Sequence, residues 1–103
     1  MATIEVDRSD VEQFLSRFRV TVIDDDGSRT HHDVTLSGAD FERLGSRYAT
    51  PEAFIDACFA FLLARETKEQ ILASFDVSQI ERYFPEFERR IVWPPEAEPA
   101  EPA

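Results

Sequence analysis

The stretch AFIDACFAFLLA, from Ala53 to Ala64, decides how this chain folds, because it is almost wholly apolar. Asp56 carries its only charge. At about 100° per residue, its large apolar side chains cover roughly twice the arc of an ordinary amphipathic helix. These side chains belong to Phe54, Ile55, Cys58, Phe59, Phe61, Leu62 and Leu63. The pattern predicts a helix that lies at the centre of the fold or forms half of an interface.

The remaining face of this helix carries small side chains, which we call the alanine stripe: Ala53, Ala57, Ala60 and Ala64. Small residues let a second helix approach closely, although alanine is also the best helix former. Two arrangements therefore stay open: burial of the whole helix within one chain, or self-association through the stripe as a homodimer. Asp56 stands at the edge of the stripe with no cation one helical turn away, so we expect it at the exposed rim.

Start and stop signals divide the rest of the chain into short elements. Thr50-Pro51-Glu52 places Thr at the N-cap and Pro at the first helical position, and it predicts a helix over 51–66. Capping signals and apolar spacing predict further helices over 9–18, 37–45, 67–75 and 78–85, and the apolar face continues from Phe87 to Ile91.

Two segments are expected to pair as strands. Residues 18–23 (FRVTVI) and 30–36 (THHDVTL) alternate β-branched and polar side chains. The turn over 24–28 contains Asp-Gly, a strong hairpin signal. Residues 3–6 are a candidate third strand at the edge. We therefore expect an α+β fold in which a two- or three-stranded antiparallel hairpin packs on four or five short helices around helix 51–66.

The length of 103 residues and the 43% apolar content suit a single small domain. We assign the domain to residues 1–93 and expect residues 94–103, rich in Pro and Glu, to be a disordered tail. Cys58 is the single cysteine, so no internal disulfide is expected. The chain shows neither a signal-peptide pattern nor an apolar run long enough for a membrane span, and we expect a cytoplasmic location.

The charge balance bears on partners. Acidic side chains outnumber basic ones by 21 to 11, which gives a formal net charge of −10. This excess argues against binding to nucleic acid and to an anionic membrane surface. It would attract and steer a basic protein partner. The alternative is that the charge only keeps the protein soluble.

No motif predicts catalysis or metal binding. His31 and His32 are neighbours in a strand, so their rings point to opposite faces and cannot chelate one ion. The acidic turn over 24–27 lacks the alternate ligand spacing of a calcium loop. The chain contains no nucleophile elbow, phosphate-binding loop or dinucleotide fingerprint. We therefore expect no catalytic residue, no metal and no cofactor.

Residues 67–84 have the outline of a helix-turn-helix motif, but Asp76 stands where Gly is usual and Arg82 where an apolar residue is usual. A nucleic-acid-associated regulator is thus one alternative function, and a small-molecule binder with a pocket between hairpin and helices is another. Polar side chains at helix ends form either a contact cluster or ordinary salt bridges. They are Arg65, Glu66, Arg82, Tyr83 and Glu86.

The segment FAFLLARETKEQILASFDVSQIERYFPEFERRI, preceded by the hairpin FRVTVIDDDG…HHDVTLS, resembles a family of small uncharacterised bacterial proteins. Members share a strand hairpin, a helix end similar to FLLxRE and a closing segment similar to RYFPEFE. The resemblance implies a small bacterial domain and brings no activity or functional residue with it. The matching residues are Phe61, Leu62, Leu63, Arg65, Glu66, Ile71, Phe75, Ile80, Tyr83, Phe84, Pro85 and Phe87.

The preferred hypothesis is a small acidic, non-catalytic module for protein interaction or regulation. Its contact surface is expected at the edge of the hairpin or at the alanine stripe.

Overall fold

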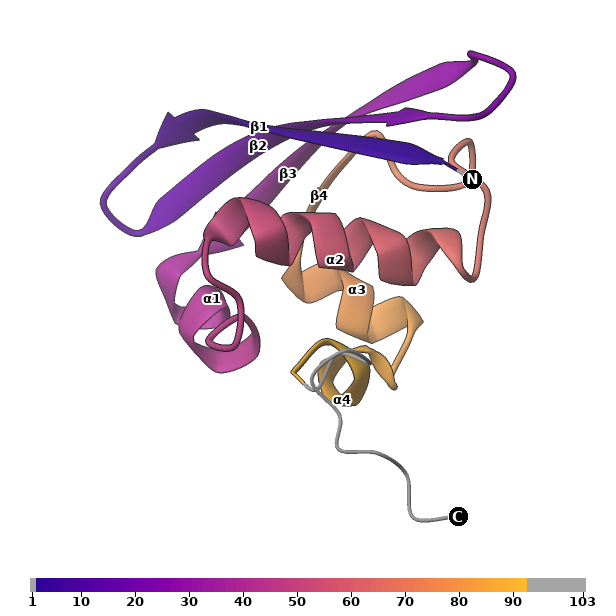
Figure 1. The fold of residues 1–103 in the computed structure, drawn as a ribbon. Helices are drawn as coiled ribbons and strands as arrows, with labels where there is room; N and C mark the ends of the chain where they lie inside the picture. The colour runs from indigo at the N-terminus through magenta and orange to yellow at the C-terminus, as the bar shows by residue number, and fades with distance from the viewer. Residues whose placement is uncertain (1, 93–103) are drawn as a thin grey trace.

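The computed structural model describes residues 2–92, which form one sheet with helices packed against one of its faces (Figure 1). Strands follow the order β1-β2-β3-β4, with β1–β2 and β2–β3 antiparallel and β3–β4 parallel. The α+β class is confirmed: the predicted hairpin is β2–β3, the candidate third strand over residues 3–6 lies within β1, and β4 completes a four-stranded mixed sheet. In chain order the elements are β1 Thr3–Val11, β2 Leu15–Ile23, β3 Arg29–Ser37, α1 Gly38–Leu44, α2 Pro51–Leu63, β4 Ser74–Asp76, α3 Ser78–Tyr83 and α4 Phe87–Val92.

Helix α2 lies in the core, as its composition predicts. Phe54, Ile55 and Phe59 are completely buried among side chains of the sheet and of the other helices. The helix begins as expected, because the Thr50 hydroxyl accepts a hydrogen bond from the backbone N–H of Ala53 at 3.1 Å. No helix within residues 2–92 is long and apolar enough to cross a membrane.

Helix α2 ends at Leu63, short of the predicted end at residue 66. The backbone N–H groups of Arg65 and Glu66 both bond to the carbonyl of Leu62 at 2.9 Å, which closes the last turn. The chain then leaves the helix and passes toward the sheet.

The predicted helix over 9–18 is wrong: these residues belong to the β1–β2 hairpin. Strand β2 needs a partner on each side, and β1 satisfies its backbone groups along one of them. The helical spacing of apolar residues was misleading, because Val11 and Phe14 are 59% and 74% exposed at the hairpin turn. The Ser-x-x-Glu signal falls where a β-bulge interrupts the register between Arg8 and Asp10.

The predicted helix over 67–75 is also wrong. This segment makes turns and then forms β4, which pairs with the outer side of β3. One contact of the capping signal at the start of this segment is present, since Gln70 Oε1 accepts from the N–H of Thr67 at 2.8 Å. Phe75 is buried and its ring packs against that of Phe59, with centroids 5.9 Å apart. Residues 67–84 therefore contain no helix pair of the helix-turn-helix kind.

The remaining elements agree with their signals. Gly27 adopts a φ of 86° in the β2–β3 turn, a conformation suited to glycine. The Ser37 hydroxyl caps α1 by accepting from the N–H of Asp40 at 3.0 Å. The apolar face after Pro85 forms α4, where Phe87 and Ile91 are buried. The predicted tail over 94–103 lies outside the described residues.

Candidate functional site

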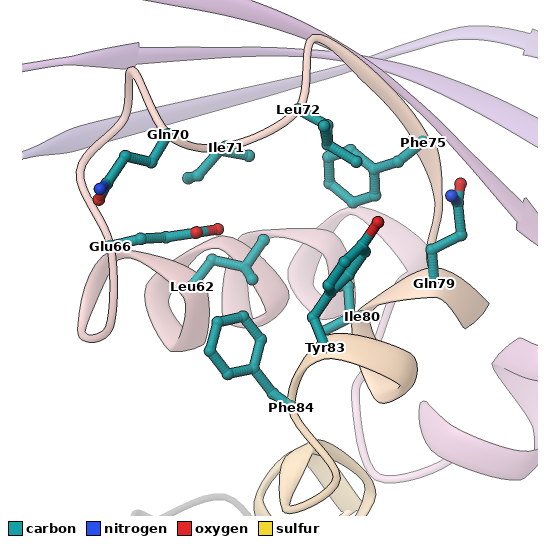
Figure 2. Close-up of a pocket in the computed structure, with 10 residues that line it drawn as sticks. All are labelled: Leu62, Glu66, Gln70, Ile71, Leu72, Phe75, Gln79, Ile80, Tyr83 and Phe84. Atoms are coloured by element: carbon teal, nitrogen blue, oxygen red, sulfur yellow. The ribbon is translucent and has the colours of Figure 1, made fainter.

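A groove opens between the end of α2 and helix α3 (Figure 2). We call it the α2–α3 groove. The loop between α2 and β4 forms its third side, and its volume is about 340 Å³. The lining residues are Leu62, Glu66, Gln70, Ile71, Leu72, Phe75, Gln79, Ile80, Tyr83 and Phe84.

The floor of the groove is apolar and its rim exposes two large side chains. Leu62, Ile71 and Ile80 are almost fully buried below it. Leu72 at the rim is 47% exposed, and Tyr83 is 66% exposed. Exposed apolar surface that is contiguous with a hollow is typical of a binding surface rather than of ordinary solvent-facing protein.

Glu66 places a carboxylate in this apolar setting. Within residues 2–92 its side chain has no hydrogen-bond or ion-pair partner, and partial burial raises the pKa of its carboxyl. The neighbouring Arg65 does not neutralise it. That guanidinium lies 3.6 Å from the centroid of the Phe61 ring and donates to Glu86 Oε2 at 3.1 Å. A ligand that brings a cation to Glu66 would therefore stabilise the charged carboxylate.

Two glutamines add hydrogen-bond donors. Gln70 Oε1 accepts from the N–H of Thr67, and Gln79 Oε1 accepts from the N–H of Asp76, both at 2.8 Å. These bonds use the amide oxygens, so the amide nitrogens remain as donors. Figure 2 shows the two side chains on opposite sides of the groove. They could orient the carbonyl groups of a bound peptide.

The predicted polar cluster is divided by the structure. Arg65 and Glu86 form a salt bridge, as the ordinary interpretation of that cluster predicts. Glu66 and Tyr83 both line the α2–α3 groove. Arg82 is exposed and is not among the lining residues.

The alanine stripe is not buried within the described chain. Ala53, Ala60 and Ala64 are exposed, and Ala57 is half-buried. Asp56 lies at the exposed rim, as expected, and desolvation by the neighbouring protein raises the pKa of its carboxyl. Within residues 2–92, the structure therefore does not show full burial of the helix, which is one of the two arrangements that the sequence left open.

Part of the stripe borders a second hollow, wider and more open, of about 970 Å³. This hollow is lined by residues at the end of α2 and at the start of β1: Ala60, Leu63, Ala64, Ala2 and Ile4. Acidic side chains of the β2–β3 turn and of the loop after α2 surround it: Asp24, Asp25, Asp26, Glu66 and Glu69.

Lys68 is a structural residue that sequence reasoning missed. It is only 4% exposed, and its Nζ donates to Asp24 Oδ2 and to Glu69 Oε2, both at 2.6 Å. The two carboxylates raise the pKa of its ammonium group. The pair with Asp24 fastens the loop after α2 to the β2–β3 turn, and the sequence offers no signal for a contact between such distant residues.

The two histidines lie on opposite faces of β3. His31 is exposed and His32 is buried on the opposite face of β3, as predicted. His32 Nδ1 donates to the carbonyl of Leu72 at 2.7 Å, and the Thr30 hydroxyl donates to Nε2 at 2.8 Å. In the part of the chain that the structure describes, no three candidate ligands come together.

Comparison of the chain with protein-family models, with curated proteins and with solved structures found no match. The functional argument therefore depends on the geometry of the described surfaces.

Proposed function

We propose that this domain is a non-catalytic interaction module that binds a basic segment of a partner protein in the α2–α3 groove. The observation that carries the proposal is the carboxylate of Glu66, which has no cationic partner within residues 2–92 although it borders an apolar hollow. A partner segment with one large apolar side chain and a nearby Lys or Arg would match both features.

The rim residues support a peptide ligand. Covering the exposed parts of Leu72 and Tyr83 would remove apolar area from water, at about 25 cal/mol per Å². Tyrosine is also among the residues that contribute most to protein interfaces. The net charge of −10 would steer a basic partner toward the domain and would make association faster at low salt.

The test compares two variants that each remove one exposed aromatic ring. Tyr83→Ser removes a ring from the groove, and Phe14→Ser removes an equally exposed ring from the distant β1–β2 turn. Each tagged protein is used to capture partners from nuclease-treated lysate of the host. We expect one basic protein in stoichiometric amount with wild type and with Phe14→Ser, and its loss with Tyr83→Ser.

The captured partner is then purified and titrated by calorimetry. Tyr83→Ser should weaken binding about tenfold or more, as expected for a central aromatic contact. Glu66→Gln should reduce the dependence of the affinity on salt. Recovery of the protein alone, or a partner that binds Tyr83→Ser as tightly as wild type, would contradict the proposal.

The size of the groove favours a second candidate. A volume of about 340 Å³ is within the range of small-molecule sites. A small ligand with an apolar body and a cationic group would use the same residues. A rise in the melting temperature of wild type, but not of Glu66→Gln, on addition of such a compound would support this alternative.

A further inference from the structure

A second surface, independent of the α2–α3 groove, lies at the edge of the sheet. Strand β1 is the first strand of the sheet order, so only one of its sides is paired within residues 2–92. Its segment Thr3–Arg8 pairs regularly with β2 before the bulge and contains no proline. An edge strand of this kind exposes backbone N–H and C=O groups that can pair with another strand.

Helix α2 lies beneath this strand and runs antiparallel to it. At one end, Arg8 donates to Glu52 Oε1 at 2.7 Å. At the other end, Ile4 and Leu63 border the same open hollow. Figure 1 shows β1 and α2 side by side at this margin of the molecule.

The face of α2 just beyond β1 belongs to the alanine stripe. At about 100° per residue, Asp56 and Ala60 follow Glu52 around the helix, away from the buried side. Both are exposed. A strand added to β1 would therefore place alternate side chains over Asp56 and Ala60.

The charges of β1 oppose pairing with a second copy. Two copies paired antiparallel at this edge are related by a two-fold axis perpendicular to the sheet. This axis keeps each side chain on the same side of the sheet, so residues directly opposite each other must both point to the same side. The two registers with the longest overlap of Thr3–Arg8 place Glu5 opposite Glu5, or Glu5 opposite Asp7. Like charges directly opposite each other destabilise a pair of strands.

The same charges favour a basic strand. Glu5 and Asp7 lie on the solvent face of the sheet, where their partners on β2 are Thr21 and Arg19. Glu5 thus has no cation across from it in the sheet. The outer side of both acids is open to side chains of an added strand.

We propose that the edge of β1 binds an extended basic segment of a partner protein, paired antiparallel, with basic side chains opposite Glu5 and Asp7. The residue between the two bases lies opposite Val6 and points toward α2, and the proposed partner has an apolar side chain there, which packs against Val6. The recognised pattern is basic–apolar–basic. The proposal does not depend on the function assigned to the groove.

The probe is a fluorescent, end-capped peptide, Ser-Thr-Lys-Val-Lys-Thr-Ser, titrated into the whole protein by anisotropy. We expect binding to wild type, and weakening of about tenfold or more in the double variant Glu5→Lys, Asp7→Lys. The control Asp33→Lys, Glu42→Lys makes the same change of net charge at exposed positions on β3 and α1. It should lose much less affinity, and the peptide with Glu in place of both Lys should prefer the Glu5→Lys, Asp7→Lys variant.

Two further peptides test backbone pairing. One is N-methylated at both Lys residues and the other at Val. Only one edge of an added strand faces β1, so one of the two peptides should lose binding and the other should keep it.

Three results would overturn the proposal. The first is a dissociation constant of the wild-type protein weaker than about 1 mM, and the second is equal binding of both methylated peptides. The third is an affinity for the peptide that does not change in the Glu5→Lys, Asp7→Lys variant. Loss of peptide binding in Tyr83→Ser would place the peptide in the groove, which would refute the edge site while supporting the proposed function.

Discussion

Asp76 shows how one side chain joins three parts of the fold. Its carboxylate accepts hydrogen bonds from the hydroxyl of Thr35 on β3 and from both the N–H and the hydroxyl of Ser78 at the start of α3. Burial by itself would raise the pKa of this carboxyl, but the bonds from Ser78 and Thr35 outweigh burial and hold the pKa below its usual value.

This geometry predicts a pH-dependent contribution to stability. The folded-state pKa lies below the unfolded value of about 3.9, so ionised Asp76 stabilises the fold above that pH. The contribution is lost as the pH falls through the folded-state pKa. We expect Asp76→Asn to reduce the free energy of unfolding by about 1 kcal/mol at pH 7.

Urea unfolding at a series of pH values checks this prediction. Between about pH 5 and pH 2, the stability of Asp76→Asn should fall less steeply than that of wild type. Asp33→Asn, a change at an exposed carboxyl on the neighbouring strand, controls for the lost charge. If the free energy of unfolding depended on pH in the same way for wild type and Asp76→Asn, the stabilising role of ionised Asp76 would be refuted.

At the scale of elements, α2 organises the core. Phe59 at its middle is fully buried and touches two segments far away in the chain. Its ring centroid lies 5.4 Å from that of His32 on β3 and 5.9 Å from that of Phe75 on β4. The helix therefore holds the edge pair β3–β4 in place as well as covering the sheet.

Substitutions at Phe59 test the central position of α2. Phe59→Asp should unfold the domain, because it buries an unpaired charge. Phe59→Ala should retain the fold but lose about 3–5 kcal/mol of stability. Thermal unfolding of both variants is measured by calorimetry. A cooperative transition of Phe59→Asp near the wild-type melting temperature would show that α2 is not central to the core.

At the scale of the whole molecule, the excess of acidic charge opposes compactness. The formal net charge of −10 is spread over a single small domain and its C-terminal residues. Local ion pairs relieve only part of it, among them Arg43 with Glu81 and Arg65 with Glu86. Self-repulsion is therefore expected to lower the stability at low ionic strength.

The melting temperature should accordingly rise when salt is added at pH 7. Calorimetry at about 10 and 200 mM NaCl measures the effect, because the Debye length shortens from about 30 Å to less than 10 Å over that range. Near pH 4.5, where the net charge vanishes, the same addition should change little. A fall in melting temperature at pH 7 would mean that the surface ion pairs dominate.

The parts of the fold that local sequence signals predict are those whose geometry is local. The cap at Thr50, the turn at Gly27 and the apolar arc around Phe59 each depend on neighbouring residues, and the structure contains all three. The errors arose where a local signal was ambiguous. Val11 and Phe14 had helical spacing, yet Val11 is the last residue of β1 and Phe14 lies in the turn that follows.

The candidate sites were only partly visible in the sequence. Glu66, Tyr83 and the alanine stripe were singled out, but the groove was not, because residues 67–75 were expected to be helical. Leu72, at the rim of the groove, lies in the loop between α2 and β4, and the path of this loop determines its position. The sequence suggested an edge strand over residues 3–6, and the order of the strands places the whole of β1 at the edge.

By itself the sequence determined the α+β class, the central helix α2, the β2–β3 hairpin and the acidic surface. Each of these follows from composition or from periodicity within one segment. Only the tertiary structure decided that the edge strand, which the sequence suggested over residues 3–6, extends to Val11, that Phe75 enters the sheet, and that Glu66 has no partner within residues 2–92 beside a groove. Those features depend on contacts between distant residues, where burial and backbone pairing outweigh local helix preference.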